Sequence, residues 1–236
     1  MKRLALPVLL LSLASCAHGL APLGEKEHPV SVISFKPGDK VPAVLREKAL
    51  PVDPKDPELR QLIDGMLVEL DRTGGVGLAA PQVGVSRRVV LVKVHTRPKG
   101  KEEPTVLAFV NPAIEDVSQD TDLDWEACLS VEGVGGMVRR FNRIILTHDP
   151  IGGGPRLRER LADWDARIAQ HEVDHLDGVL FTDKVAGPLV PIDEMRKRRD
   201  ELHRKRGWLP PEAPAATPAA SPMAPVPGDP AAPVSP

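Results

Sequence analysis

The stretch Gln170-His171-Glu172-Val173-Asp174-His175-Leu176-Asp177-Gly178 decides how the rest of this chain is interpreted. In a helix, His171 and His175 lie one turn apart on the same face, where two imidazoles can bind one divalent metal ion. Glu172 lies beside them and can take a proton from water. The last residue, Gly178, indicates a left-handed helix end. Two histidines can also share a helix face without function, but the full H-E-x-x-H pattern is much rarer than a histidine pair.

Two histidines need a third ligand, because a catalytic metal site typically has three protein ligands and one position open to water. The residues alone leave three candidates, which are Cys128 upstream and Glu194 or His203 downstream. A downstream ligand is typical of zincin-type peptidases, whereas an upstream cysteine indicates different chemistry. A disulfide between Cys16 and Cys128 is a further possibility in an exported protein. Each cysteine lies in a motif of its own, which argues against that bridge.

The segments around the motif predict an α+β domain. Asp56 is a good N-cap for a helix that begins at Pro57, carries apolar residues at helical spacing and ends at Gly74. A second helix carries the histidines, and a charged third helix spans residues 192–206. Strands are expected at residues 32–35, 88–94, 106–110, 114–117, 137–141 and 144–147, with a glycine-bearing loop at 133–136. Short strands with two or three helices indicate an α+β domain rather than a βαβ repeat.

Three stretches in order carry a family resemblance. They are Gly75-Val76-Gly77-Leu78-Ala79-Ala80-Pro81-Gln82, Glu126-Ala127-Cys128-Leu129-Ser130 and Gln170-His171-Glu172-Val173-Asp174-His175. Together they resemble the three signature motifs of peptide deformylases, and the resemblance extends through most of residues 32–206. It implies a fold of antiparallel sheets packed around a central helix that carries the H-E-x-x-H motif, plus a C-terminal helix.

The resemblance also implies a metal centre. Cys128, His171 and His175 would bind one divalent metal ion, usually iron(II) in this family, with zinc, nickel or cobalt as substitutes. Glu172 would take the proton of the attacking water and later pass one to the leaving amine. The implied reaction is hydrolysis of the N-terminal formyl group of N-formylmethionyl peptides, which releases formate.

The remaining implied roles concern the substrate. The side chain of Gln82 and the backbone N–H of Leu129 would hold the developing oxyanion, and Val76 and Gly77 would line the peptide path. Two other functions stay open, a zincin-type metallopeptidase and an exported deformylase-like binding protein with weak or no turnover. The latter is suggested by Ala127, which stands where the family pattern prefers glycine, a substitution that is strained if this backbone needs a positive φ.

The two ends of the chain predict export and a disordered tail. Lys2 and Arg3 precede an apolar run at residues 4–13, and Leu13-Ala14-Ser15-Cys16 resembles a bacterial lipoprotein cleavage box. We therefore expect a signal peptide at 1–16, a linker at 17–31, the enzyme domain at 32–208 and a disordered Pro/Ala-rich tail at 209–236. Lipidated Cys16 would anchor the protein to a bacterial membrane on the periplasmic side, and a cytoplasmic location is the alternative. The net charge of -2 gives no reason to expect nucleic-acid binding, and we expect a monomer.

Overall fold

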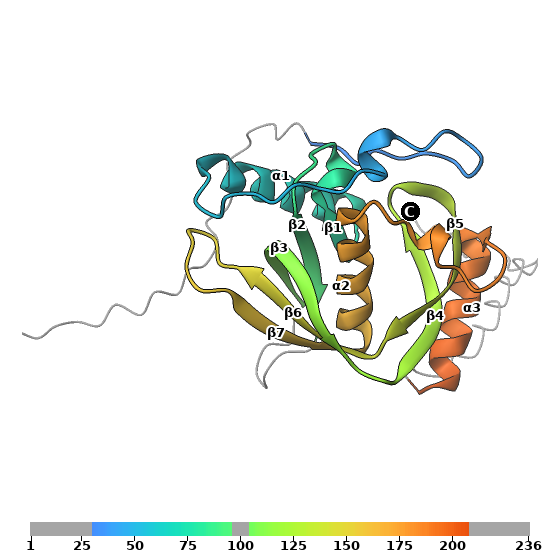
Figure 1. Cartoon of the computed structure of the whole chain (residues 1–236). Helices are drawn as coiled ribbons and strands as arrows, with labels where there is room; N and C mark the ends of the chain where they lie inside the picture. Colours follow the sequence, from blue (N-terminus) through green and yellow to red (C-terminus); the bar gives the residue numbers. More distant parts are fainter. Residues whose placement is uncertain (1–29, 96–103, 208–236) are drawn as a thin grey trace, which may run out of the picture.

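The computed structural model describes residues 30–95 and 104–207, and this part of the chain has an α+β fold. A five-stranded sheet has the order β1-β2-β3-β6-β7, and a smaller sheet has the order β4-β5-β8. All neighbouring strands in both sheets are antiparallel. Helix α2 (Asp163–Leu176) runs between the two sheets, as Figure 1 shows. The expected arrangement of antiparallel sheets around a central helix is confirmed.

The remaining elements surround this centre. Helix α1 (Pro57–Thr73) lies against the larger sheet, and α3 (Ile192–Lys205) packs on the outside of the smaller one. The strands are β1 (Gly77–Ala79), β2 (Val89–Val94), β3 (Thr105–Val117), β4 (Thr121–Cys128), β5 (Val131–Phe141), β6 (Arg143–Asp149), β7 (Leu157–Ala162) and β8 (Val190–Pro191). Three short 3-10 turns are η1 (Ala43–Leu45), η2 (Ala80–Val83) and η3 (Phe181–Asp183).

Helix α1 forms where its local signals predict it. The carboxylate of Asp56 accepts a hydrogen bond from the Glu58 N–H at 2.9 Å, and Pro57 occupies the first turn. Gly74 ends the helix with a left-handed φ of 64°. Leucine, isoleucine and methionine side chains on one face of the helix are buried against β1 and β2.

Strand β2 of the larger sheet is buried on both faces. Val90, Val92, Phe109 and Leu146 pack against α2, whereas Leu91 belongs to the cluster that α1 covers. Because successive residues of a strand face opposite sides, β2 contributes to both clusters. Each fully buried side chain of this size contributes roughly 1.5–3 kcal/mol. This packing makes α2, which carries the two histidines, one of the most firmly held elements of the described chain.

The expected division into two strands at residues 106–110 and 114–117 is wrong, because one strand spans both. Strand β3 continues through Asn111 and Pro112, and a register shift between Val110 and Ala113 accommodates one extra residue of β3 against β6. Asn111 takes a positive φ of 49°, which asparagine tolerates better than most residues. Its side chain exchanges hydrogen bonds with the backbone of Val52, so contacts that are distant in the sequence stabilise the irregularity.

The expected glycine loop at residues 133–136 is also wrong, because β5 runs through it and pairs with β4. A Cβ added at Gly135 would lie 2.6 Å from Met195 Cγ and 2.9 Å from the carbonyl oxygen of Glu126. Glycine therefore allows α3 to approach the strand closely. The expected strand at 32–35 is reduced to a single bridge between Phe35 and Val131.

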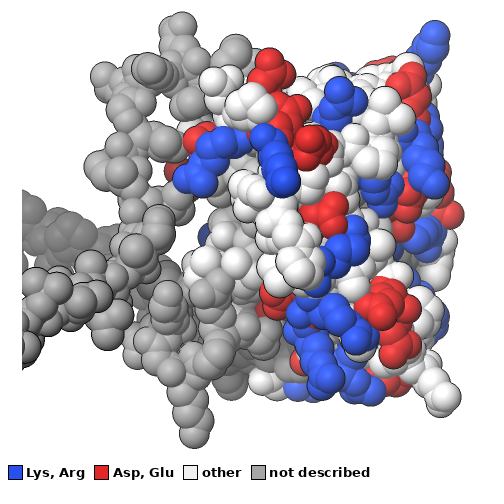
Figure 2. Space-filling view, turned by 60° about the vertical axis from the view of Figure 1, so that its left-hand side comes forward, with Lys and Arg blue, Asp and Glu red and all other residues white. Residues whose placement is uncertain are grey.

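The surface carries mixed charge. Figure 2 shows positive and negative side chains interspersed over the face that it presents. The ion pair of Arg158 with Glu115 links β7 to β3 across β6, and Arg143 of β6 pairs with Asp120 in the connection between β3 and β4. Within the described ranges no helix is long and apolar enough to span a membrane. The predicted signal peptide, nearly all of the linker and the C-terminal tail lie outside the described residues.

Candidate metal centre

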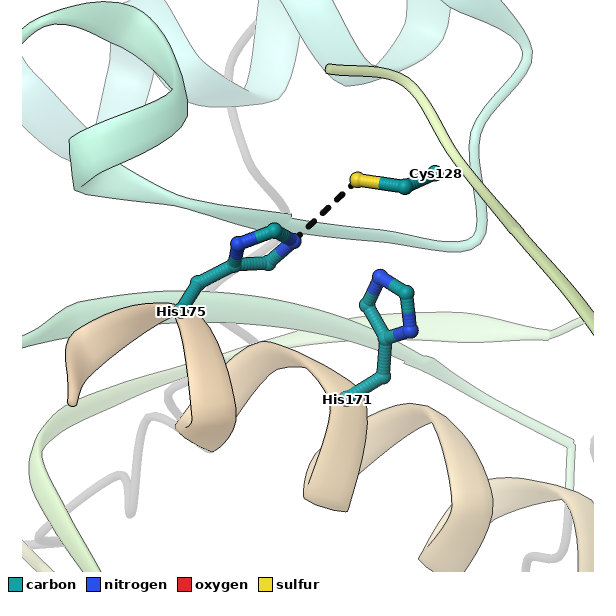
Figure 3. A group of neighbouring side chains, drawn as sticks. All are labelled: Cys128, His171 and His175. Carbon is teal, nitrogen blue, oxygen red and sulfur yellow. Dashed lines mark hydrogen bonds between the residues drawn. The ribbon is translucent and has the colours of Figure 1, made fainter. Parts of the chain in front are cut away.

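Helix α2 presents His171 and His175 on one side, and β4 brings Cys128 toward them from the facing sheet (Figure 3). The helix ends as its sequence predicts, since Asp177 is the C-cap and Gly178 takes a φ of 71°. A break in the β4–β5 pairing between Ala127 and Cys128 marks the turn at the end of β4. The geometry of helix α2 thus determines where the two imidazoles lie, and the β4–β5 hairpin determines where the thiol of Cys128 lies.

These three side chains form a compact group of metal-ligating type. Cys128 Sγ lies 3.2 Å from His175 Nε2, and the ligand atoms of Cys128, His171 and His175 all lie within 4.8 Å of one another. For comparison, a tetrahedral zinc ion with bond lengths of about 2.3 Å to sulfur and about 2.0 Å to nitrogen would hold such atoms roughly 3.5 Å apart. The buried Cys/His/His set is therefore consistent with a divalent metal.

The alternative ligands lie in other contacts. Among the residues described, the group of Cys128, His171 and His175 is the one such cluster. His203 contacts Asp124 through Nε2 at 2.8 Å. Glu194 forms an ion pair with Arg198 one turn along α3. These contacts favour the upstream cysteine over a downstream third ligand.

A buried ion-pair network orients His171. Its Nδ1 lies 3.0 Å from Glu126 Oε2, and Glu126 accepts further hydrogen bonds from Arg140 at 2.9 Å and from Arg167 at 2.8 Å. Arg140 also reaches Asp174. A carboxylate on Nδ1 turns the other ring nitrogen of a histidine toward a metal and raises its basicity. The network therefore leaves Nε2 of His171 as the nitrogen available for a ligand bond.

The same contacts shift the pKa values of the site. Burial acts to raise the pKa of Glu126, but hydrogen bonds and charge from His171 and Arg140 hold it far below its ordinary range. Burial acts to lower the pKa of His171, yet its partners Cys128 and Glu126 raise it. For His175, burial and the nearby His171 both lower the pKa. Glu126 is thus a permanent anion behind the site.

Glu172 lies on the same face of α2 as His175, three residues further along, and is 4% exposed. Burial, reinforced by the negative charges of Glu126 and Asp174, raises its pKa to about 7, although His171 and Arg140 oppose the shift. Its Oε2 has no hydrogen-bond partner among the described residues. A group with a pKa near the working pH is well suited to exchange protons, and a bound cation would lower this pKa again.

Gln82 projects from η2 into the site. Its Oε1 accepts a hydrogen bond from the Ala79 N–H at 2.8 Å, which directs the amide nitrogen toward the cysteine. Nε2 lies 3.5 Å from Cys128 Sγ and 3.3 Å from Ser130 Oγ. The structure therefore brings the Gln82 amide to the thiol of Cys128.

The other expected site residues lie around this group. Gly77 is in β1, where an added Cβ would lie 2.3 Å from Glu172 Oε1. Val76 is 38% exposed just before the strand, and Leu129 follows Cys128 in the turn between β4 and β5. Ala127 has no positive φ, so the strain expected from replacing glycine is absent.

Three participating residues were not assigned to the chemistry from the sequence. Glu126 lies within the cysteine motif, but its contact with His171 joins segments 45 residues apart and no short motif signals it. Arg167 precedes His171 by four residues, so helical spacing alone could have placed both on one face. Ser130 offered no such signal, because its contact depends on η2, which is distant in the sequence.

Comparisons with known proteins agree with this geometry. A family model described as "Polypeptide deformylase" matches residues 36–189. Peptide deformylase 2 of Gloeobacter violaceus is 40% identical over 153 residues, covering 65% of this chain and 78% of the relative. A Met-Ala-Ser-bound crystal structure of a class I type b peptide deformylase from Acinetobacter baumannii matches with a TM-score of 0.58 and 33% identity, covering 66% of this chain and 98% of that one. The crystal structure of peptide deformylase from Thermotoga maritima matches with a TM-score of 0.57 and 34% identity, covering 67% of this chain and 98% of that one. This chain therefore belongs to the peptide deformylase family.

Proposed function

We propose that this site removes the formyl group from N-formylmethionyl peptides, with Cys128, His171 and His175 as the metal ligands and Glu172 as the proton-transfer group. The observation that carries the proposal is the convergence of one buried thiol and two imidazoles beside a buried carboxylate. Membership of the family supports the reaction, because hydrolysis of formylmethionyl peptides is what this family does.

The metal ion, Glu172 and Glu126 would each have a separate role in the reaction. When bound, a divalent metal supplies Lewis-acid polarisation and lowers the pKa of water to about 7. Glu172 takes a proton from the attacking water and returns one to the leaving amine of the peptide. Its burial and raised pKa support both halves of this role. Glu126 keeps His171 oriented while charge changes in front of it.

The developing oxyanion needs hydrogen-bond donors. The Nε2 amide of Gln82 is directed at the cysteine sulfur, and the Leu129 N–H follows that residue directly in the turn, so both donors border the place where the formyl oxygen would lie. Removing one such donor typically costs about 3–4 kcal/mol of transition-state stabilisation.

The peptide itself has an edge strand to pair with. Strand β1, which contains Gly77, is the outermost strand of the larger sheet, and Val76 stands partly exposed beside it. An extended peptide can add to such an edge through main-chain hydrogen bonds. The Met-Ala-Ser-bound relative from Acinetobacter baumannii supports a peptide ligand of this length for the present chain.

The test is formate release by the full chain, loaded with iron(II) or zinc and given formyl-Met-Ala-Ser. The wild type should release formate, and Glu172→Ala should keep one metal ion per chain while losing turnover. Full activity in Glu172→Ala would contradict its role. Cleavage of internal peptide bonds, with metal still bound in Cys128→Ala, would instead indicate a zincin-type peptidase. Metal binding without any turnover in the wild type would indicate a binding protein.

The identity of the metal is part of the proposal. The family resemblance favours iron(II), with nickel and cobalt as substitutes. In an oxidising compartment an iron ion on a thiolate is vulnerable, which would favour zinc. Metal analysis of protein purified from its native compartment separates the two, since iron alone would exclude the zinc form.

We also propose export and lipid anchoring, on the strength of the cleavage-box stretch that ends at Cys16. Cys16→Ser should move the protein from the membrane fraction to the soluble fraction while formate release stays unchanged. A wild-type chain recovered only from the cytoplasm would contradict the anchor and favour the alternative location. We further propose a monomer, which sedimentation of the purified chain can test.

A further inference from the structure

We infer that Ser130 is a positioning residue for this reaction, because its hydroxyl holds the carboxamide of Gln82 in the orientation that aims the second amide hydrogen at the metal centre. The inference rests on the proposed function of Gln82 as an oxyanion donor. It concerns a side chain that is fully buried and whose hydroxyl oxygen lies 3.3 Å from Gln82 Nε2.

The oxygen end of the Gln82 amide is fixed first. Oε1 accepts the Ala79 N–H at 2.8 Å, and only the oxygen of a carboxamide can accept from a donor. This contact decides which end of the amide faces the site, so the NH₂ group points toward β4. Gln82 is 1% exposed, which leaves its amide no bulk water as an alternative partner.

The nitrogen end then has two hydrogens to place. Nε2 lies 3.3 Å from Ser130 Oγ and 3.5 Å from Cys128 Sγ. A hydrogen bond to the hydroxyl fixes the plane of the amide and leaves the other hydrogen on the side of the sulfur. Without the hydroxyl, a buried donor would be left unpaired, and the amide would be free to turn away from the site.

The backbone around the pair is also held from one segment. The Ile33 N–H donates to the carbonyl of Gln82 at 2.7 Å, and the Phe35 N–H donates to the carbonyl of Ser130 at 3.1 Å. Two residues that lie 48 positions apart are thus tied to neighbouring points of one short segment. This arrangement explains how the two side chains come within reach of each other. The backbone hydrogen bonds hold Gln82 and Ser130 side by side, independently of the contact between their side chains.

The first test is a double-mutant cycle on the full chain loaded with cobalt(II). Ser130→Ala should lower kcat for formyl-Met-Ala-Ser about 10-fold, less than the roughly 10²–10³-fold typical for deleting an oxyanion donor, with KM and metal content unchanged. In the Gln82→Ala background, Ser130→Ala should cause no further loss. Ser130→Thr, which keeps the oxygen, should recover most of the activity. The half-buried Ser118, whose hydroxyl donates to the Asp120 carbonyl and accepts from the Arg143 N–H instead of contacting Gln82, is the control, and Ser118→Ala should keep wild-type kcat.

An equal loss from Ser130→Ala in both backgrounds would overturn the inference, as would wild-type kcat in Ser130→Ala. A second measurement does not need turnover. The chain has four glutamines, so the side-chain NH₂ signal of Gln82 can be assigned in a ¹⁵N spectrum by its loss in Gln82→Ala. This signal should shift and broaden in Ser130→Ala but not in Ser118→Ala, and an unchanged signal would also overturn the inference. If the wild type released no formate, the proposed function would fail while the NMR result would still decide the contact.

Discussion

At the scale of single residues, the position of Glu172 depends on an atom that Gly77 does not have. A Cβ at Gly77 would meet Glu172 Oε1 at 2.3 Å and its Cδ and Cγ at 2.8 Å. Contacts this short cannot persist, so one of the two residues would have to move. Glycine at position 77 therefore provides the space in which the carboxylate of Glu172 lies.

We predict that Gly77→Ala lowers kcat about 100-fold, because a displacement of about 1 Å at the reacting group can have this effect. The three atoms nearest to the added carbon all belong to Glu172 and none to a proposed metal ligand, so metal content measured by elemental analysis should stay at one ion per chain. A substituted protein with wild-type kcat would show that Glu172 adapts without loss. Loss of the metal would instead show that the change spreads beyond this carboxylate.

At the scale of elements, Glu126 joins β4 and β5 to helix α2. It accepts from Arg140 in β5 and from Arg167 in α2, and both guanidinium groups are buried with it. We predict that Glu126→Gln destabilises the protein by about 3–5 kcal/mol, since it leaves two buried cations without their shared anion. It should also weaken metal binding about 10–100-fold through the loss of its carboxylate behind His171.

Urea denaturation and a metal-competition titration measure these two effects. The matched control is Glu115→Gln, which removes an exposed ion pair with Arg158 and should change the free energy of unfolding by less than about 1 kcal/mol. Equal destabilisation by both substitutions would contradict the special weight given to the buried carboxylate.

Glu69 of α1 holds the first part of the described chain against this helix. Glu69 accepts the Val32 N–H at 2.7 Å and pairs with Arg72, whose hydrogen bond lowers the pKa of Glu69 below its ordinary value even though burial opposes the shift. Because the folded-state pKa is the lower one, ionised Glu69 stabilises the fold above the ordinary value of 4.5. This contribution is lost as the pH falls through the folded-state pKa.

We therefore predict that Glu69→Gln lowers the free energy of unfolding at pH 7 by about 1 kcal/mol, a modest value because the partner Arg72 is largely exposed. The difference from wild type should shrink as the pH falls below about 4.5, as measured by urea denaturation at several pH values. Glu47→Gln, at an exposed position, should show little difference at any pH. A stability difference between wild type and Glu69→Gln that grew as the pH fell would contradict the lowered pKa of Glu69.

The elements also show what the sequence could predict and why the rest escaped. Helices α1 and α2 were predicted because caps, glycine ends and helical spacing are local signals. Strands β3 and β5 were broken wrongly at Asn111 and at the glycine-bearing stretch 133–136, because pairing with other strands overrides local breakers. Strand β7 was missed altogether, since its three consecutive charged residues, Arg158, Glu159 and Arg160, lie on a sheet edge and resemble a loop.

The same division holds within the candidate site. The proposed ligands Cys128, His171 and His175 were predicted together with Glu172 and Gln82, because all five lie in short sequence motifs. Support from Arg167 and Ser130 could not be predicted in the same way, because each acts across a contact between segments 41 and 48 residues apart. The family pattern identifies the reacting groups, whereas the fold supplies the groups that orient them.

At the scale of the whole molecule, the ligand set bridges the two sheets. Cys128 belongs to the smaller sheet, and the two histidines belong to the helix that packs on the larger one. A metal ion held by all three would therefore resist separation of the two halves. Such an ion binds the native state but not this arrangement in the unfolded chain, so it must stabilise folding by mass action.

We predict that a chelator lowers the melting temperature of the metal-loaded chain by roughly 10 °C. Free metal at a thousand times its Kd contributes about 4 kcal/mol, and 1 kcal/mol corresponds to about 2–4 °C for a domain of this size. Calorimetry should show the shift reversed by added zinc or cobalt. Cys128→Ala should melt at a temperature that chelator barely changes, because two histidines from one helix cannot tie the sheets together. If chelation instead lowered the melting temperature of Cys128→Ala as much as that of wild type, the stabilising ion would be held without the cysteine, and the bridge between the sheets would not exist.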